Sequence, residues 1–237
     1  MRTVLVTGGS RGIGLEFTRQ YLAKGCLVFA ASRKAEDSAD LQQFQARYGD
    51  RLGICPLDVA EEESRRDLFR ALSARTERLD LLINSAGVLS GNEEFCRSLG
   101  ALDQADLCKT FLVNSIAPLM MVEGALPLLI QGAPSVVANL SSDNGSISRK
   151  RSKGKYGYSA SKAALNMITK ILSIELREQG IVVVSLHPGW VQTTMTRKEK
   201  APLTPAESIG GLIRVIEALE MKDTGRFLDW KGRELRW

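Results

Sequence analysis

A tyrosine and a lysine four residues apart are the side chains in this sequence best suited to proton transfer. Tyr158 and Lys162 stand at the start of a helical pattern of apolar residues, which places both on one face of the helix. A lysine ammonium beside a phenol lowers the phenol pKa from about 10, so that the tyrosine can donate or accept a proton near neutrality. Tyr156 is an internal comparison, because the residue four positions after it is Ala160. The spacing therefore favours Tyr158 as the general acid or base.

A glycine-rich segment follows the first apolar run of the chain. Residues Thr7 to Gly14 read TGGSRGIG, and residues with helical apolar spacing come directly after them. Glycines let the backbone turn tightly and approach a pyrophosphate, whose charge is stabilised by the free N–H groups and the positive dipole end of the helix. The segment predicts a phosphate-binding site, and the alternative is a tight turn without function.

The same segment also fits a second kind of site. Residues Gly8 to Gly12 match the Gly-x-Ser-x-Gly nucleophile elbow of hydrolases, and Ser10, Asp80 and His187 occur in the hydrolase order. That fold takes part of its oxyanion hole from a loop preceding the elbow, and only nine residues precede Ser10 here. A hydrolase is therefore the less favoured interpretation.

Short apolar runs alternate with longer stretches of helical period along the whole chain, which is typical of a parallel sheet covered by helices. A capping box at Thr204–Glu207, with proline at the first helical position, predicts one further helix start. We expect an α/β fold, a Rossmann-type doubly wound sandwich with a seven-stranded, mainly parallel sheet and helices on both faces. The predicted strands are Thr3–Thr7, Leu27–Ala31, Leu52–Leu57, Leu79–Ile83, Ser135–Leu140, Ile181–Leu186 and Arg226–Trp230.

Length and composition indicate one domain over residues 1–237. With 237 residues, 44% of them hydrophobic and 25% charged, the chain can bury one sizeable core. No apolar stretch approaches about 18 residues and no basic, apolar leader opens the chain, so we expect neither a membrane span nor secretion. Cys26, Cys55, Cys96 and Cys108 form no CxxC pair and have only His187 to join them. This usage predicts no metal site, no disulfide framework and a cytoplasmic location.

The net charge of +5 is concentrated in one short segment. Arg149, Lys150, Arg151, Lys153 and Lys155 contribute all of it, with no acidic residue among them. A nucleic-acid-binding protein more often spreads a basic face over several elements, so we expect no nucleic-acid partner. Three interpretations stay open: a solvated loop, a surface that attracts anionic substrates, and a contact for a partner or a nuclear-localisation-like match.

Taken in order, the motifs resemble the short-chain dehydrogenase/reductase family over essentially the whole chain. The closing segment Phe227–Trp237 and the residues around Tyr158 look most like the small C-factor-like and Sniffer-like carbonyl reductases. Two features depart from the family pattern: Ser85 replaces an asparagine, and the segment between Ser142 and Tyr158 is longer than in many members. The matching residues are Gly8–Gly14, Asp58, Asn84-Ser85-Ala86-Gly87, Asn114, Ser142, Tyr158 with Lys162, and Pro188-Gly189 with Thr193.

The resemblance implies a catalytic tetrad of Asn114, Ser142, Tyr158 and Lys162. Tyr158 would protonate the carbonyl oxygen while hydride arrives from the nicotinamide, and Lys162 would lower the Tyr158 pKa and bond the nicotinamide ribose. Ser142 would hold the substrate oxygen, and the family spacing selects it over Ser141. Asn114 would hold a water that relays protons to Lys162.

The resemblance also implies a nicotinamide cofactor, and the end of the second strand selects NADP(H) over NAD(H). NAD-binding relatives place an acidic residue there, whereas this chain has Ser32 followed by Arg33, and Arg11 extends from the glycine-rich loop toward the same corner. Two guanidinium groups can hold one 2′-phosphate. The residues expected to contact the cofactor are Gly8, Ser10, Arg11, Gly12, Ile13, Gly14, Ser32, Arg33, Asp58, Val59, Asn84, Ala86, Gly87, Tyr158, Lys162, Pro188, Gly189, Val191 and Thr193.

The function expected from this resemblance is an NADPH-dependent oxidoreductase that transfers hydride between nicotinamide and a carbonyl or alcohol, such as an aldehyde, ketone or quinone. The alternative is an NADP-binding redox sensor or signalling protein with little turnover. The sequence does not name the substrate, the direction or the stereochemistry.

Residues 190–205 are expected to form a substrate lid, within which Trp190 and Met195 either line the pocket or pack under the loop. His187 is expected to be structural or next to the cofactor. Family members usually pair through two long helices, here about Asp103–Gln131 and Tyr158–Gln179, so we expect a homodimer, with a tetramer as the alternative, and no membrane partner.

Overall fold

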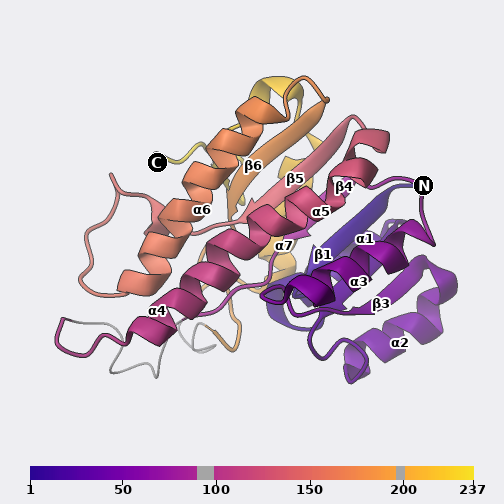
Figure 1. Ribbon diagram of the computed structural model, residues 1–237, viewed down its shortest axis with the longest axis horizontal. Helices are drawn as coiled ribbons and strands as arrows, with labels where there is room; N and C mark the ends of the chain where they lie inside the picture. The colour runs from indigo at the N-terminus through magenta and orange to yellow at the C-terminus, as the bar shows by residue number, and fades with distance from the viewer. Residues whose placement is uncertain (90–98, 196–200) are drawn as a thin grey trace.

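The computed structural model describes residues 1–89, 99–195 and 201–237, and its centre is one seven-stranded sheet (Figure 1). The strand order is β3-β2-β1-β4-β5-β6-β7, and all six pairings are parallel, so the doubly wound fold is confirmed and the sheet is parallel throughout. The strands are β1 (Thr3–Thr7), β2 (Leu27–Ser32), β3 (Leu52–Pro56), β4 (Leu81–Asn84), β5 (Ser135–Leu140), β6 (Ile181–His187) and β7 (Phe227–Asp229).

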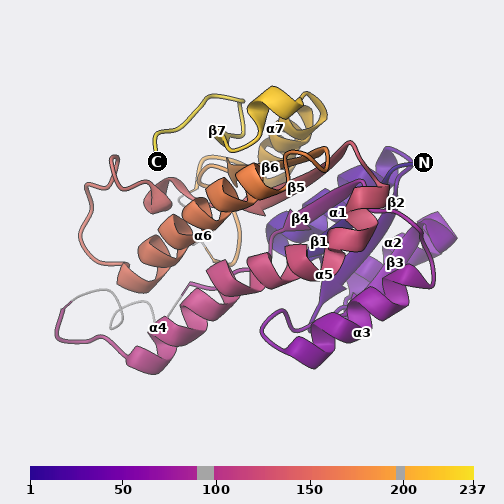
Figure 2. The same ribbon diagram turned by 45° about the horizontal axis from the view of Figure 1, so that its top comes forward.

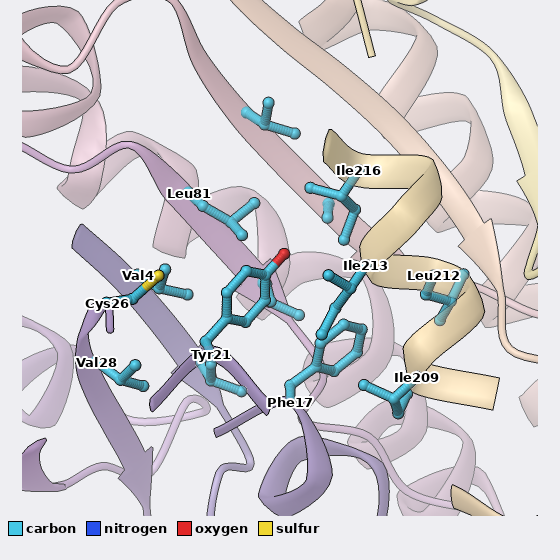
Figure 3. Packing of buried hydrophobic residues seen from close by; sticks show 14 of the residues in the cluster. Val4, Phe17, Tyr21, Cys26, Val28, Leu81, Ile209, Leu212, Ile213 and Ile216 are labelled. Atoms are coloured by element: carbon cyan, nitrogen blue, oxygen red, sulfur yellow. The ribbon is translucent and has the colours of Figure 1, made fainter. Parts of the chain in front are cut away.

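Helices cover both faces of the sheet, and each face has its own apolar core. Helices α1, α2 and α7 cover one face and α3, α5 and α6 the other (Figure 2). Side chains of β1 alternate between these cores: Val4 and Val6 belong to the first and Leu5 to the second. In the first core, Phe17 and Tyr21 of α1 lie against Ile213 of α7 (Figure 3). The helices are α1 (Gly12–Ala23), α2 (Ala39–Tyr48), α3 (Glu62–Ser73), α4 (Gln104–Phe111), α5 (Ala117–Gln131), α6 (Tyr156–Glu175) and α7 (Pro205–Glu217).

The predicted capping box at the start of α7 is present. The Thr204 hydroxyl accepts a hydrogen bond from the Glu207 N–H at 3.2 Å, and the Glu207 carboxylate accepts one from the Thr204 N–H at 3.0 Å. In the first turn of α7, the Ser208 hydroxyl donates to the Pro188 carbonyl at 2.6 Å. The cap thus fixes the helix end against the turn that follows β6.

Three boundaries of two elements, α6 and β4, differ from the prediction. Helix α6 begins at Tyr156 rather than Tyr158, because Lys155 adopts a left-handed conformation with φ of 57° and its carbonyl accepts the Ser159 N–H at 2.8 Å. The same helix ends at Glu175 rather than Gln179. Strand β4 begins at Leu81 rather than Leu79, because the Leu79 N–H is donated to the Leu128 carbonyl instead of to a neighbouring strand.

Helices α4 and α5 form one long helix over Gln104–Gln131, interrupted by a π-helical turn at Leu112–Ile116. Within the described residues, this helix is long and apolar enough to cross a membrane by length and composition. Half of its most apolar window is buried inside the protein, as in a core helix of a globular domain. Asn114 lies in the π-helical turn, and such turns are frequent at functional sites.

The arrangement separates the three residues of the hydrolase alternative. Ser10 and His187 lie where β1 and β6 end, whereas Asp80 lies just before β4 begins and accepts the Thr3 N–H at 2.6 Å. Because all strands run parallel, Asp80 is at the opposite edge of the sheet from Ser10 and His187. The hydrolase interpretation is therefore wrong.

Candidate active site

The carboxyl ends of the central strands bring the predicted site segments together at one edge of the sheet (Figure 1). The glycine-rich loop follows β1, Ser32 ends β2, Asn84–Gly87 begins at the last residue of β4, and Ser142 follows β5. Ligands of open parallel sheets bind at this edge, next to the point where the strand order reverses. Here that point lies between β1 and β4.

The glycine-rich loop is packed tightly on one side and open on the other. A Cβ atom on Gly14 would lie 2.2 Å from the Gly8 carbonyl oxygen, and one on Gly8, whose φ is +69°, would lie 3.0 Å from Ala86 Cα. At Gly12 the nearest atom to such a Cβ is the Thr193 methyl, at 3.7 Å. The loop therefore fits closely under its neighbours at Gly8 and Gly14 while Gly12 is exposed, as a phosphate cradle requires.

The N-terminus of α1 supplies donors to that space. Its first helical hydrogen bond runs from the Leu15 N–H to the Arg11 carbonyl. The N–H groups of Gly12, Ile13 and Gly14 precede that bond and have no acceptor within the helix. A phosphate at this position would receive their hydrogen bonds and the favourable end of the helix dipole.

Thr7 joins the glycine-rich loop to the segment after β4, a role that the sequence does not single out. Its hydroxyl accepts the N–H groups of Ser85 and Ala86, both at 3.0 Å. Because Ser85 contributes its backbone, its departure from the family asparagine leaves this contact intact. The signal in the sequence is a threonine at the last strand position before the glycines.

Asn84 is directed into the interior. Its amide donates to Asn139 Oδ1 at 2.9 Å and to the Pro118 carbonyl at 3.3 Å. Asn139 donates in turn to Thr169 of α6, whose hydroxyl also accepts from Ser185. This buried network ties β4, β5 and β6 to α6 through the Asn84 amide N–H groups, while Asn84 Oδ1 is buried without a hydrogen-bond partner among the described residues.

Ser142 is the serine that lies beside Tyr158. The Ser142 hydroxyl is close enough to Tyr158 to lower its pKa, whereas the Ser141 hydroxyl donates to Asn166 Oδ1 of α6 at 2.7 Å. Ser142 Oγ also accepts the Asn144 N–H at 3.2 Å, which caps the short helical turn Asp143–Gly145. The geometry thus separates the two candidates in the way that the spacing predicts.

Lys162 is buried beneath Tyr158. Its Nζ donates to the Leu140 carbonyl at 2.7 Å and lies 5.9 Å from the Tyr158 ring centroid. Burial lowers the pKa of Lys162 to about 8. A Cβ atom on Gly87 would lie 3.9 Å from this Nζ and 3.4 Å from Asn114 Oδ1, so Gly87, Asn114 and Lys162 meet at one place.

The pKa of Tyr158 is raised above its usual value of about 10, whereas the sequence predicts that Lys162 lowers it. Burial raises it, and the nearby Ser142 hydroxyl lowers it by less than burial raises it. Lys162, whose Nζ lies 5.9 Å from the ring centroid, does not outweigh this burial. The phenol is therefore held in its protonated form, which is the form that can donate a proton.

Asn114 is fully buried and engaged by protein groups. Its Oδ1 accepts the Val88 N–H at 2.8 Å, and its amide donates to the Val88 carbonyl at 2.9 Å and to Ser161 Oγ at 3.1 Å. Both amide N–H groups are thus used, so a relay water would have to bond to an oxygen of Asn114. The partners that a buried asparagine needs are found here in Val88 and Ser161.

His187 has a structural place at the end of β6. Its Nδ1 accepts the Asp143 N–H at 3.3 Å, and its Nε2 lies 3.9 Å from Asp143 Oδ1. Burial lowers the pKa of His187, which keeps the ring neutral at pH 7. These contacts agree with the structural role rather than with proton transfer.

The corner predicted for the 2′-phosphate of the cofactor contains one buried hydroxyl and two exposed guanidinium groups. Ser32 Oγ is buried and has no hydrogen-bond partner among the described residues, while Arg11 and Arg33 are exposed. Ser38 joins this corner to the glycine-rich loop by donating to the Ser10 carbonyl at 3.4 Å. Such a corner fits a phosphorylated ribose.

Asp58 and Val59 follow β3, farther along the same edge. The Asp58 carboxylate accepts the Ala60 N–H at 3.0 Å, and Val59 is nearly buried. Neither contact tests the predicted adenine-binding role.

The segment after β6 is folded back on itself next to the glycine-rich loop. Val191 pairs with Leu203, and the Gln192 N–H donates to the Leu203 carbonyl at 2.9 Å. Trp190 is 50% exposed and Met195 36% exposed, so neither is packed under the loop. Part of the predicted lid, residues 196–200, lies outside the described residues, as does Cys96.

In the part of the chain that the structure describes, no group of three or more His, Cys, Asp or Glu side chains is placed to hold a metal ion.

The burial of Lys162 generates a prediction about stability and pH. Below pH 8 the folded and unfolded chains both carry the lysine proton, and the folded chain bears the cost of burying it. As pH rises from about 8 to about 10.5 the folded chain releases the proton first, so the unfolded chain binds more protons and stability rises. Relative to a Lys162→Met variant, the free energy of unfolding should increase by about 3 kcal/mol across this range.

Urea unfolding of both proteins at several pH values, without cofactor, measures this difference. The comparison with Lys162→Met cancels other titrating groups. A difference between the two proteins that does not change with pH would show that Lys162 has an ordinary pKa.

Comparison with known proteins places these features in a family. The profile described as short chain dehydrogenase matches residues 2–203. The chain is 44% identical to C-signal of Myxococcus xanthus over 167 residues, which cover 70% of this chain and 98% of that protein.

Two solved structures resemble the whole fold. The NADPH-bound carbonyl reductase from chicken fatty liver has a TM-score of 0.92 and 35% identity, covering 100% of this chain and 99% of that one. The carbonyl reductase Sniffer of D. melanogaster has a TM-score of 0.91 and 30% identity, covering 100% of both chains. The expected likeness to C-factor-like and Sniffer-like proteins is thus confirmed, and the chain belongs to the short-chain dehydrogenase family of oxidoreductases.

Proposed function

We propose that this protein is an NADP(H)-dependent carbonyl reductase that acts on aldehydes, ketones or quinones, or on the corresponding alcohols in reverse. The observation that carries the proposal is the grouping of Tyr158 with Ser142 and with the buried Lys162, whose Nζ lies 5.9 Å from the Tyr158 ring centroid. This group lies at the same sheet edge as the glycine-rich loop. The NADPH-bound and Sniffer carbonyl reductases that the chain resembles support the same activity.

Bound NADPH would supply the hydride to the carbonyl carbon. Tyr158 would transfer its phenolic proton to the carbonyl oxygen, so that the alcohol forms without a free alkoxide. Ser142 Oγ would hold the same oxygen by a hydrogen bond and stabilise its developing negative charge. The raised pKa of Tyr158 keeps the donor protonated before the reaction.

Lys162 would become important as the phenolate forms. Its ammonium, 5.9 Å from the Tyr158 ring centroid, stabilises negative charge on that ring more than it stabilises the neutral phenol. Lys162 would also bond the nicotinamide ribose. Asn114 would help to position Lys162, since both side chains lie next to Gly87. In the reverse direction Tyr158 would accept the alcohol proton.

The residues proposed to hold NADP(H) are those grouped along the sheet edge. Gly12, Ile13 and Gly14 would bind the pyrophosphate, and Ser32, Arg11 and Arg33 the 2′-phosphate. The proposed remaining contacts are Gly8, Ser10, Asp58, Val59, Asn84, Ala86, Gly87, Pro188, Gly189, Val191 and Thr193. Residues 190–205 would close over the substrate.

The likeness to C-signal favours one second candidate, a signalling protein that binds NADP with little turnover. Such a role would not require Ser142 beside Tyr158 or a buried lysine. The effect of removing the Tyr158 hydroxyl separates the two candidates.

We also propose a homodimer that pairs through the long helix Gln104–Gln131, which comprises α4 and α5, and through α6, with a tetramer as the alternative. The outer face of α6 carries Met167, Ile171 and Ile174, which are 62%, 47% and 65% exposed, and Ile116 on the neighbouring π-helical turn is 46% exposed. An exposed apolar stripe of this kind is typical of a contact surface.

A cytoplasmic location is proposed from cysteine usage. Cys26, Cys55 and Cys108 are free thiols, which suits a reducing compartment.

Tyr158→Phe should keep the fold and NADPH affinity and lower turnover by at least about 100-fold, because only the proton donor is removed. Consumption of NADPH at 340 nm with a panel of aldehydes, ketones and quinones measures this. Tyr156→Phe is the matched control, since Tyr156 is exposed in the same helical turn and should retain full activity. Unchanged turnover in Tyr158→Phe would remove the assigned role.

The unsubstituted protein should prefer NADPH over NADH by at least tenfold in affinity, which corresponds to about 1.4 kcal/mol. Ser32→Asp combined with Arg33→Ala should reverse the preference, by adding a repelling carboxylate and removing a phosphate ligand. Fluorescence titration with both cofactors measures the two affinities. Equal affinities before substitution would mean that neither arginine reaches the phosphate.

Ile171→Glu should convert the dimer to a monomer, because it places a charge within the apolar stripe of α6. Sedimentation velocity measures the mass. Ile147→Glu introduces the same charge at a residue that is 79% exposed and lies outside these helices, and it should leave the dimer intact. A monomeric unsubstituted protein would contradict the proposed pairing.

A further inference from the structure

The basic segment 149–155 borders the site. It connects the turn Asp143–Gly145, which follows Ser142, to helix α6, which carries Tyr158 in its first turn (Figure 1). Five of its seven residues are Lys or Arg, and none is acidic. The whole net charge of the protein therefore stands in the connection between two proposed catalytic residues.

Both ends of this segment are fixed to helix α6. Lys150 Nζ donates to Ser159 Oγ at 2.9 Å, and Ser159 is the residue after Tyr158. Lys155 caps the same helix, where its carbonyl accepts the Ser159 N–H at 2.8 Å. Lys150 is thus held beside the turn of α6 that carries the proposed proton donor.

The stretch before the basic segment is fixed as well. Ser146 Oγ donates to the Arg236 carbonyl at 2.6 Å, and Ser148 Oγ donates to the Trp237 carbonyl at 2.8 Å. Trp237 in turn stacks on Phe227 of β7, with ring centroids 5.4 Å apart. With contacts on both sides of the segment, Lys150 is placed before any ligand arrives, which lowers the entropic cost of using its charge.

The charges of the segment are not neutralised within the protein. In the described chain, no carboxylate lies within ion-pair distance of any of the five cations. Burial lowers the pKa of Lys150, and the neighbouring Lys155 lowers it further. Asp143 acts on Lys150 in the opposite direction, but its carboxylate accepts from Ser142 and Asn144.

A second cation of the segment acts on the other side of the site. Arg149 is close enough to His187, at the end of β6, to contribute to the lowering of its pKa. Cations of segment 149–155 thus influence both α6 and the end of β6, and an anion between these elements would interact with more than one of them.

We propose that segment 149–155 is a recognition rim for carbonyl substrates that carry a carboxylate remote from the reacting carbonyl. The proposal rests on the proposed function and names its substrate class. An ionic contact away from the reacting atoms attracts and orients the substrate without taking part in the proton transfer. Lys150 would be a specificity-determining residue, and Tyr158 and Ser142 would act on either class of substrate.

The test compares substrates that differ only in charge. For 4-carboxybenzaldehyde and its neutral methyl ester, kcat/KM should favour the anion by about tenfold at low ionic strength, and the preference should fall as salt is added. Lys150→Met should remove most of the preference with little effect on the ester, and Lys150→Arg should retain it. Lys222→Met is the matched control, since Lys222 is an exposed lysine just before β7, at the opposite edge of the sheet.

A second measurement does not depend on turnover. Isothermal titration of the NADP-loaded protein should show benzoate binding more tightly than benzamide, and Lys150→Met should abolish the difference. The proposal would be overturned if 4-carboxybenzaldehyde and its methyl ester had equal kcat/KM values and benzoate and benzamide bound equally. It would also be overturned if Lys222→Met lost the preference for the anion to the same extent as Lys150→Met. Absence of turnover with every carbonyl compound would contradict the proposed function, while the benzoate comparison would still decide the proposal.

Discussion

Burial of the Lys162 ammonium is the constraint around which the site is built. The described structure gives it one hydrogen-bond acceptor, the Leu140 carbonyl at the end of β5, and burial brings its pKa to about 8. A buried cation of this kind is unfavourable for folding, so the surrounding elements must hold it in place. Gly145 lets the turn Asp143–Gly145 lie close to helix α6, because a Cβ atom on residue 145 would lie 2.8 Å from the Lys162 backbone. Helix α6 can therefore lie directly on the turn that follows Ser142.

The sheet edge depends on similar close approaches. Gly14 packs against the Gly8 carbonyl, and the Thr7 hydroxyl accepts the N–H groups of Ser85 and Ala86. The glycine-rich loop and the segment after β4 are therefore held in direct contact. Hydrogen bonds among Asn84, Asn139, Thr169 and Ser185 connect strands β4, β5 and β6 to helix α6. Buried hydrogen bonds of this kind hold their donors and acceptors in one arrangement. The proposed catalytic side chains thus stand on a support that is polar as well as apolar.

The sequence predicts the features that are local. Unbroken apolar runs identify the strands, and the glycine-rich loop and capping box follow from neighbouring residues. The start of α6 was harder to predict, because the left-handed conformation of Lys155 has no sequence signal comparable to a glycine. The roles of Asn84 and Asn114 depend on Asn139 and Val88, which lie 55 and 26 residues away. The pKa of Tyr158 depends on burial by the completed fold, and for that reason the lysine spacing alone gave the wrong direction.

The hydrogen bonds of Ser146 and Ser148 to Arg236 and Trp237 join segments 89 or 90 residues apart. They have a consequence for the order in which the protein is completed on the ribosome. Chain synthesis proceeds from the N-terminus at about 5–20 residues per second, so earlier elements can form while later ones are still absent. The loop beside Ser142 lacks these acceptors until residues 236 and 237 emerge. A nascent chain that has already formed strands β1 to β6 would therefore contain the proposed cofactor-binding elements, while Ser146 and Ser148 in the loop after Ser142 would still lack their hydrogen-bond acceptors.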